Sequence, residues 1–401
     1  MKIVLLAPFG IRPKGTVIAR MLPLANELQH LGDEVVIIAP PYTNPEDSGK
    51  VEMLDGVLLR NVMLGPRNKA LAAPVLAWRL FRCALKEKPD LIHLFKPKGY
   101  GGLATMAMIM LRRAGFRLPP VLLDTDDWEG SGGMNELHGY SSLEQRVYAF
   151  QEKWLSRHAA AVTVASRGLE EMSRKLGVPD SRLLYLPNCV RGQRAGDGEA
   201  VRARLGIAPD TPVVLLYTRF FEFEQDRLAS VFAEIHRRLP AVRFLVVGQG
   251  RHGEEAQLLA AGREAGFAED LVMAGWVEPG DLPDYLAAGD VAIYPFSDTL
   301  VNRCKCPAKL TELLLAGCPV VGDRVGQVAE YIEAGRSGIL CGPDAWQGMA
   351  DQVVALLNDP SRRKELGLAG RGRLLQQFNW RQYAQRLAKF YRTVLSGTAE
   401  R

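Results

Sequence analysis

The sequence predicts an α/β protein made of two doubly wound domains, and three observations support this prediction. The 401 residues exceed what one hydrophobic core usually serves. Short β-branched runs alternate with helical patterns along the chain, which is typical of parallel sheets built from βαβ units. A polar stretch at residues 191–199 separates two such series. We therefore expect one domain at residues 1–190 and a second at 191–378.

Each domain is expected to form a parallel sheet covered by helices. One such helix, at residues 19–31, has leucines at helical spacing and is followed by Gly32, which suits a left-handed C-terminal position. Strands of the first domain are expected at residues 3–8, 34–39, 57–62, 90–95, 121–124, 161–165 and 183–186. Strands of the second are expected at 212–217, 243–247, 271–274, 291–294, 319–321 and 338–340. Because such sheets bind ligands beyond the carboxyl ends of their strands, we expect the functional residues there, in a cleft between the domains.

The charge is unevenly distributed along the chain. Residues 1–190 carry 24 Lys and Arg against 19 Asp and Glu, whereas residues 191–401 carry 26 of each, so the first half holds the whole net charge of +5. This excess favours an anionic ligand, or peripheral contact with an acidic membrane surface, although a solvated surface is the simpler interpretation. The amphipathic basic stretch at 78–86 is in turn more typical of a helix on its own sheet than of a membrane anchor. No nucleic-acid partner is expected.

Other features of the composition indicate a cytoplasmic protein. The longest apolar run, at residues 103–111, is much shorter than the ~20 residues that span a bilayer. The apolar stretch at the start is too short for a signal peptide. Six cysteines in a chain of this length do not indicate a disulfide framework, so reduced thiols are expected.

A GxGxxG pattern at residues 248–253 follows an expected strand and precedes a helix. Glycines there let backbone amides approach a phosphate near a positive helix end, so Gly248 and Gly250 are candidate donor-binding residues. A dinucleotide site would need an acidic residue after the next strand, whereas Glu269 and Asp270 precede it. A plain strand-to-helix turn lining a cleft remains the alternative.

A cluster of cations precedes the helix expected from Pro307 to Gly317. Arg303, Lys305 and Lys309 gather at its positive end, which suits a diphosphate, and Glu312 lies where it could accept bonds from sugar hydroxyls. A surface ion pair between Lys309 and Glu312 is the alternative. Cys304 and Cys306 lack the further ligands of a structural zinc site, so we expect no metal there.

Three carboxylates, Asp124, Asp126 and Asp127, follow another expected strand of the first domain. They could orient a hydroxyl, act as a base or hold a divalent cation, or they could serve a helix cap or loop network.

Two further segments of the first domain follow strands whose carboxyl ends are expected to face the cleft. Lys14 and Gly15 lie in the irregular loop after the first strand. His93 lies inside an apolar strand and is predicted to be a core residue, whereas Lys96 and Lys98 just beyond it are better placed for ligand contact.

Four segments of the second half resemble the retaining glycosyltransferases of the GT-B fold, in particular family 4 of glycosyltransferases. These segments are residues 244–250, 273–286, 287–295 and 307–321, and the resemblance extends over nearly the whole chain. It implies a GT-B architecture and transfer of a sugar, from a UDP- or GDP-linked donor to an acceptor hydroxyl, with retention of configuration. It also implies that a helix at about 379–396 packs back on the first domain.

Carried over by position, the resemblance makes Glu312 the second glutamate of the family's paired motif, which binds the nucleotide ribose. The first glutamate of that motif is replaced by Cys304. Arg219 matches the arginine of the family's diphosphate-binding pair, and Lys309, with Lys305 or Arg303, is expected to supply the second cation. Asp126 stands nearest the position that a histidine takes in many members.

Together these considerations predict a cytoplasmic sugar transferase that needs no metal or other cofactor. Asp126, Arg219 and Lys309 are expected to be catalytic. The acceptor is a glycan, a lipid-linked molecule or a small molecule. The alternatives are a sugar nucleotide epimerase of the same fold and a non-catalytic subunit that binds nucleotide sugars. The expected donor-binding residues are Gly15, Arg219, Gly248, Gly250, Val277, Arg303, Lys305, Lys309, Leu310 and Glu312, and the acceptor-side residues are Lys14, Lys98, Asp124 and Asp127.

Overall fold

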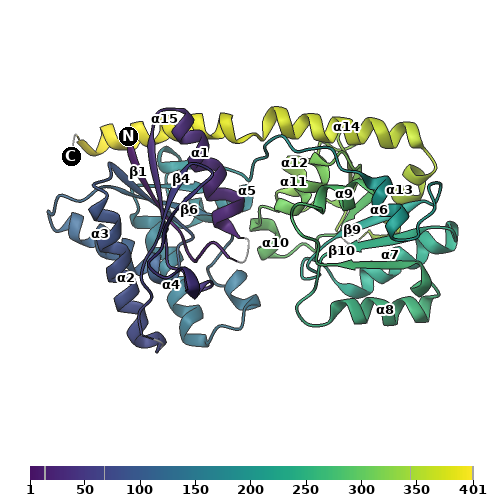
Figure 1. The fold of residues 1–401 in the computed structure, drawn as a ribbon, viewed down its shortest axis with the longest axis horizontal. Coiled ribbons are helices and arrows are strands. Elements are labelled where there is room, and N and C mark those ends of the chain that lie inside the picture. The colour runs from purple at the N-terminus through teal and green to yellow at the C-terminus, as the bar shows by residue number, and fades with distance from the viewer. Residues whose placement is uncertain (13–14, 67, 344, 400–401) are drawn as a thin grey trace. The chain divides into compact units, whose positions relative to one another are not determined.

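The structure is a computed structural model that describes residues 1–12, 15–66, 68–343 and 345–399. These residues form two compact units (Figure 1). The first unit comprises Met1–Cys189, Arg303–Cys306 and Trp380–Arg401, and the second comprises Val190–Asn302 and Pro307–Asn379. Each unit is a parallel α/β sheet with helices, so the predicted fold class is confirmed.

The described part of the first unit contains an eight-stranded sheet in the order β3-β4-β2-β1-β5-β6-β7-β8. Every neighbouring pair is parallel except β3 and β4. The central strands are almost wholly buried, which explains their near-continuous apolar sequences. The strands are β1 (Lys2–Leu6), β2 (Glu34–Ala39), β3 (Val51–Leu54), β4 (Val57–Asn61), β5 (Leu91–Phe95), β6 (Val121–Thr125), β7 (Ala161–Val164) and β8 (Leu183–Tyr185).

The edge strand β3 was not expected from the sequence. It forms an antiparallel hairpin with β4, and its turn residues Asp55 and Gly56 have φ values of +46° and +81°. An Asp-Gly pair with two positive φ values is a common two-residue hairpin turn, so the signal was local. Its side chains alternate between exposed and half-buried, as suits a strand at the edge of a sheet.

Helices cover both faces of this sheet. The chain after β1 enters a π-helical turn, η1 (Val17–Met21), before α1 begins, instead of the single helix expected at 19–31. The last helix packs against α1, while α2, α3 and α4 lie next to one another on the other face (Figure 1). The helices are α1 (Leu22–His30), α2 (Lys69–Lys86), α3 (Gly99–Arg113), α4 (Ser142–His158), α5 (Arg167–Lys175) and α15 (Trp380–Ala399).

The described part of the second unit contains a six-stranded parallel sheet in the order β11-β10-β9-β12-β13-β14. Phe232, Phe244 and Phe267 pack together in its core. The strands are β9 (Val213–Tyr217), β10 (Arg243–Val247), β11 (Leu271–Gly275), β12 (Val291–Tyr294), β13 (Val320–Asp323) and β14 (Ile339–Cys341). The helices are α6 (Gly198–Arg204), α7 (Gln225–Arg238), α8 (Glu254–Ala265), α9 (Leu282–Ala287), α11 (Ala308–Leu315), α12 (Val328–Tyr331), α13 (Trp346–Leu357) and α14 (Pro360–Gln377). A further helix, α10 (Leu300–Cys304), begins in this unit, and its last two residues group with the first unit.

The strand order reverses between β1 and β5 in the first unit and between β9 and β12 in the second. Sheets of this kind bind ligands beyond the strand ends at such a reversal. No described helix combines the length and apolarity needed to cross a bilayer.

Candidate functional site

In the first unit, Asp126 lies where the ends of β1, β5 and β6 meet. Its Oδ1 is 2.8 Å from Lys96 Nζ, and its Oδ2 accepts a hydrogen bond of 3.2 Å from Thr16 Oγ1. Burial alone would raise the pKa of Asp126, but the charges of Lys96 and Arg20 hold it below its usual range. Asp126 is therefore an ionised carboxylate that two other strand ends hold in place.

Lys96, which the sequence marked as well placed for ligand contact, organises this cluster. It adopts a left-handed backbone conformation (φ +62°), which is uncommon for a residue with a side chain, and it is 7% exposed. Its ammonium also lies 2.6 Å from Asp127 Oδ2. The surrounding carboxylates outweigh the effect of burial and raise its pKa well above the usual value. Lys96 thus fixes the relative positions of Asp126 and Asp127.

Asp124 does not have the acceptor-contacting position expected of it. It is fully buried within β6, and its carboxylate accepts bonds of 2.8 and 2.7 Å from Nε and Nη2 of Arg20 and one of 2.5 Å from Thr163 Oγ1. Arg20 also donates to the carbonyl oxygen of Leu186. Because these groups occupy both carboxylate oxygens, Asp124 is a positioning residue in the core and has no surface for an acceptor.

Lys98 and a buried acid pair lie beside this cluster. Lys98 Nζ is 2.7 Å from Glu129 Oε1 and 5.5 Å from the ring centroid of Tyr140. Beneath it, Glu152 on α4 accepts a bond from the backbone N–H of Glu129. Burial, and then the charge of Glu129, raises the pKa of Glu152 to about 8. No sequence pattern indicated Glu152, which lies in the middle of an ordinary amphipathic helix.

The other residues of the first domain that the sequence analysis discussed are Gly15, Lys14 and His93. Gly15 is half-buried two residues before η1, and its carbonyl oxygen accepts a bond from the N–H of Ala19. Lys14 lies outside the described residues. His93 is fully buried, its Nδ1 lies 2.7 Å from the hydroxyl of Tyr391 on α15, and burial lowers its pKa to about 4. The prediction that His93 is a core residue is therefore confirmed.

In the second unit, Tyr217 connects the expected donor-binding residues. It ends β9, and its hydroxyl donates a bond of 2.9 Å to Glu312 Oε2 on α11. Lys309 Nζ, one turn earlier on α11, lies 5.4 Å from the centroid of the Tyr217 ring. Burial, and then the charge of Glu312, raises the pKa of Tyr217, so the phenol keeps its proton and donates it. Arg219 follows two residues later and interacts electrostatically with Tyr217.

Sequence reasoning missed Tyr217 because it ends an apolar strand 95 residues from Glu312. The structure brings Lys309, Glu312 and Arg219 close to this one ring. A carboxylate and two cations beside a strand end can bind hydroxyl groups and an anion together.

In the glycine-rich turn after β10, backbone amides donate hydrogen bonds to glutamates of the helix that follows, α8. Gly248 has φ +113°, and a Cβ there would lie 2.0 Å from the carbonyl oxygen of Thr218. The N–H of Gly250 donates to Glu255 and that of His252 donates to Glu254, both over 2.6 Å. Two amides that could bind a phosphate are thus occupied by glutamates of α8. Gly248 is required for close backbone approach, whereas Gly250 serves a strand-to-helix turn.

Two other expected donor-binding residues differ in accessibility. Val277 is half-buried after β11. The side chain of Leu310 is fully buried, so it packs in the core of the unit and has no surface for a ligand. The helical periodicity that marked Leu310 is accordingly a packing signal.

The stretch Arg303–Cys306 groups with the first unit, whereas Lys309 belongs to the second. Ser166 donates a bond of 2.6 Å to the carbonyl oxygen of Cys304. Cys304 is 1% exposed, and burial raises the pKa of its thiol to about 12. A buried, protonated thiol cannot replace the charge of a glutamate.

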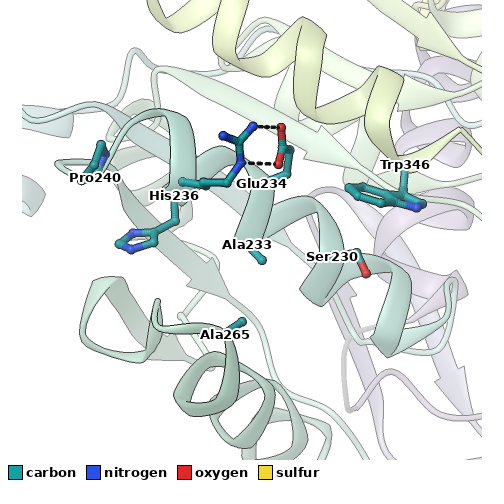
Figure 2. Close-up of a pocket in the computed structure, with 8 residues that line it drawn as sticks. Ser230, Ala233, Glu234, His236, Pro240, Ala265 and Trp346 are labelled. Carbon is teal, nitrogen blue, oxygen red and sulfur yellow. Dashed lines mark hydrogen bonds and ion pairs between the residues drawn. The ribbon is translucent and has the colours of Figure 1, made fainter.

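A separate pocket of about 610 Å³ lies along α7 of the second unit (Figure 2). Ser230, His236 and Trp346 line it, together with Glu234, which is paired with Arg237 over 2.8 and 2.9 Å. Helix α7 leads from the end of β9 to the start of β10. Its last turns are therefore at the amino edge of the sheet, and the pocket is distinct from the groups around Tyr217. The described residues contain no cluster of three or more His, Cys, Asp or Glu able to hold a metal ion.

Two families of known proteins match this chain. Residues 15–189 match the family described as glycosyl transferase 4-like domain, and residues 211–359 match glycosyl transferases group 1. One relative is a GDP-mannose-dependent alpha-(1-6)-phosphatidylinositol monomannoside mannosyltransferase of Mycolicibacterium smegmatis, which is 27% identical over 92% of this chain and 91% of its own length. Glycogen synthase of Mycobacterium tuberculosis is 23% identical over 93% and 90%.

Solved structures agree with these relationships. Sucrose-phosphate synthase from Thermosynechococcus elongatus has a TM-score of 0.77 at 19% identity, covering 99% of this chain and 100% of that one. Anabaena HepE in complex with UDP-glucose has a TM-score of 0.73 at 18% identity, covering 98% and 99%. These matches, the two parallel sheets and the charged groups at their strand ends lead to one conclusion: the chain belongs to the GT-B-fold glycosyltransferases, with a glycosyl transferase 4-like domain followed by a group 1 domain.

Proposed function

We propose that this glycosyltransferase transfers a hexose from a UDP- or GDP-linked donor to an acceptor hydroxyl, with retention of configuration. The observation that carries the proposal is the hydrogen bond from Tyr217 to Glu312, with Lys309 beside the same ring. The names of one relative and of one solved complex include GDP-mannose and UDP-glucose, which supports a nucleotide sugar donor.

The second unit would stabilise the leaving group. As the bond between sugar and phosphate breaks, negative charge grows on the diphosphate, and cations held in place beforehand act where that charge develops. Arg219 and Lys309 supply these cations. Glu312 has one oxygen oriented by Tyr217, and its carboxylate accepts bonds from the ribose hydroxyls. Neutralisation by these two side chains needs no metal ion.

The first unit would supply the acceptor side. The lowered pKa of Asp126 keeps its carboxylate ionised, so it can accept a hydrogen bond from the attacking hydroxyl. Lys96 and Thr16 hold it in one orientation, which is what the positioning of a nucleophile requires. Asp127 and Lys98, which are 20% and 13% exposed, flank it.

A double-mutant cycle tests the diphosphate assignment. Arg219→Ala and Lys309→Ala should each lower transfer about 100-fold, and the double variant should lose less than the product of the two, because both cations act on one diphosphate. Binding of nucleoside monophosphate should weaken less than binding of diphosphate. Arg204→Ala is the matched control, since Arg204 also lies over a tyrosine ring, that of Tyr285. Unchanged transfer in either single variant contradicts the assignment.

Four measurements test the rest of the proposal. Thermal shifts with uridine, guanosine, adenosine and thymidine diphosphates identify the base, because a ligand at 100 times its Kd stabilises by about 2.7 kcal/mol. NMR of the product from labelled donor reports the anomeric configuration, and an inverted product contradicts retention.

Release of free nucleotide without any acceptor would favour an epimerase, and no turnover would favour a binding subunit. Loss of transfer with EDTA, restored by Mn²⁺ or Mg²⁺, contradicts the metal-free mechanism.

A further inference from the structure

The two units differ in how much apolar side chain they expose. Of the described residues, 17 large hydrophobic ones are exposed, 14 in the first unit and 3 in the second. Eight of the 14 lie on α2, on α4, and on α3 or just after it. They are Leu71, Trp78, Leu103, Met110, Phe116, Leu143, Val147 and Phe150, and their exposed fractions range from 36% to 72%. A concentration of this kind marks an interaction surface.

These residues form a stripe on each helix. On α4, Leu143, Val147 and Phe150 are spaced by four and three residues and so share one face. On α3, Leu103 and Met110 are two turns apart, as are Leu71 and Trp78 on α2. Helix α3 packs against both α2 and α4, and the three lie on one side of the sheet (Figure 1). Their outward stripes therefore belong to one surface, which we name the α2–α4 face.

Basic residues lie on the same helices as these apolar residues, most of them towards the carboxyl ends. Arg82 and Lys86 come after Trp78 on α2, and the guanidinium of Arg82 lies 6.0 Å from the Trp78 ring centroid. Arg113 ends α3, and Lys153 and Arg157 come after Phe150 on α4. All five of these cations are exposed.

Much of the negative charge of this region is buried beneath the helices. Asp124, Glu129 and Glu152 are at most 1% exposed. The cations on the outside are therefore not balanced by these carboxylates, and the exposed surface has a positive character.

The direction of the three helices shows which of their ends lies near Asp126. Each helix crosses back between parallel strands, so α2, α3 and α4 run in the same direction. Their amino ends follow the carboxyl ends of strands, where Thr16, Lys96 and Asp126 lie. Leu71, Leu103 and Leu143, near the amino ends of these helices, are thus on the same edge of the unit as Asp126, whereas Lys86, Arg113 and Arg157 at their carboxyl ends are farther from it.

We propose that the α2–α4 face docks on an anionic lipid bilayer and that the acceptor is lipid-linked. Tryptophan, phenylalanine and leucine side chains enter the boundary between headgroups and acyl chains, while the cations contact anionic headgroups. Docking by this face brings the edge that carries Asp126 towards the headgroups, where a lipid-linked hydroxyl would be presented. The acceptor class rests on the proposed function, whereas docking itself does not.

Vesicle flotation tests the docking. The chain should bind vesicles of phosphatidylcholine with phosphatidylglycerol, and bind vesicles of phosphatidylcholine alone at least tenfold more weakly. The combined variant Trp78→Ser, Leu143→Ser and Phe150→Ser should lower binding to the anionic vesicles at least tenfold. The control is Leu368→Ser in the second unit, because Leu368 is 63% exposed on α14 and should not affect binding. All four residues are exposed, so unchanged melting temperatures should show that the variants fold.

Fluorescence locates the contact. Brominated acyl chains quench an indole that enters the bilayer, so Trp78 should be quenched. The fluorescence that Trp78→Phe removes should be the quenched component, and Trp276→Phe, which alters a 55% exposed indole of the second unit, should leave the quenching unchanged. Equal vesicle binding by the combined variant and the native chain, or quenching that survives Trp78→Phe, overturns the proposal.

Two further outcomes separate the alternatives. A dimer in sedimentation without lipid that the combined variant converts to monomer means that the face binds a second copy of this chain, and the proposal is then wrong. Donor consumption with a soluble acceptor and no vesicles measures the proposed function independently. The combined variant should keep this activity while losing transfer to acceptors embedded in vesicles.

Discussion

Each unit buries an arginine–aspartate pair beside its sheet, and the two pairs differ in what they are connected to. In the first unit, Arg20 binds Asp124 over 2.7 and 2.8 Å, and it also reaches the carbonyl oxygen of Leu186 over 2.6 Å. In the second unit, Arg227 binds Asp323 over 2.6 and 2.8 Å, and Asp323 accepts a further bond from the N–H of Phe296. Both aspartates are fully buried.

The pair in the first unit belongs to a larger charged network. The charge of Arg20 acts on Asp126, two residues beyond Asp124, so the core pair also tunes the candidate site. At the site edge of the second unit, the geometry depends instead on close backbone approach at Gly248 and on one tyrosine ring. The comparison teaches that charged side chains position the groups at the strand ends of the first unit, whereas the second unit relies more on backbone geometry.

The largest expected effect is the loss of the pair in the first unit. Arg20→Met should lower the free energy of unfolding by about 3–5 kcal/mol, because it leaves the buried Asp124 carboxylate without its cationic partner. Arg227→Met should cost less, since the Arg227 side chain is 11% exposed and that of Arg20 is 1%. Urea denaturation measures both. Adding Asp124→Asn to Arg20→Met should recover part of the loss, and a single-variant loss under ~1 kcal/mol contradicts the comparison.

A backbone change in the second unit should have the next largest effect. Gly248→Ala places a Cβ 2.0 Å from the Thr218 carbonyl oxygen at φ +113°, so the loop must move, at a cost of about 2–3 kcal/mol. Gly253→Ala is the matched control, because Gly253 also has a positive φ, +82°, with nothing within 4 Å of a Cβ. Its cost should be about 1–2 kcal/mol. Equal melting temperatures for the two variants would mean that close approach is not what requires Gly248.

The buried acid of the first unit should produce a smaller, pH-dependent effect. The pKa of Glu152 is raised from 4.5 to about 8, so between these values the folded chain binds more protons than the unfolded one. Stability conferred by this group therefore falls as pH rises through that window. Glu152→Gln, which mimics the protonated acid, should raise the Tm by a few degrees at pH 8.5 and hardly change it at pH 4.5.

The control for Glu152→Gln is a glutamate with the opposite shift. The pKa of the exposed Glu171 on α5 is lowered, chiefly by its hydrogen bond with Lys175, so Glu171→Gln should give no gain at high pH. A Tm difference between Glu152→Gln and the native chain that does not vary from pH 4.5 to 8.5 would contradict a raised pKa.

The smallest expected effect is on nucleotide affinity when the first unit is changed. Asp126→Asn should lower turnover while nucleoside diphosphate affinity stays within about threefold, a difference under ~0.7 kcal/mol. Steady-state kinetics and calorimetric titration give the two quantities. If nucleotide binding collapses and transfer falls only in proportion, the acceptor-side assignment of Asp126 is wrong.

The sequence by itself determined most of the architecture. Apolar runs of strand length alternating with helical periodicity specified two parallel sheets, because a strand buried on both faces must be apolar throughout. The resemblance in residues 307–321 identified the family that the comparisons confirm. Even the missed strand β3 had a local signal in Asp55 and Gly56. These features depend on interactions between residues close together in the chain.

Only the tertiary structure decided the roles of the charged residues at the strand ends. Asp124 and Asp126 look equivalent in sequence. In the structure, Asp124 is buried in the core, where it binds Arg20, 104 residues away in the chain. Asp126 instead lies at the edge of the sheet, where it binds Lys96. Tyr217 gained a role only when Glu312 was brought within 2.9 Å of it. Burial and the distance to another charge set a carboxylate's pKa and its access to ligand, and both arise from contacts between segments far apart in the chain.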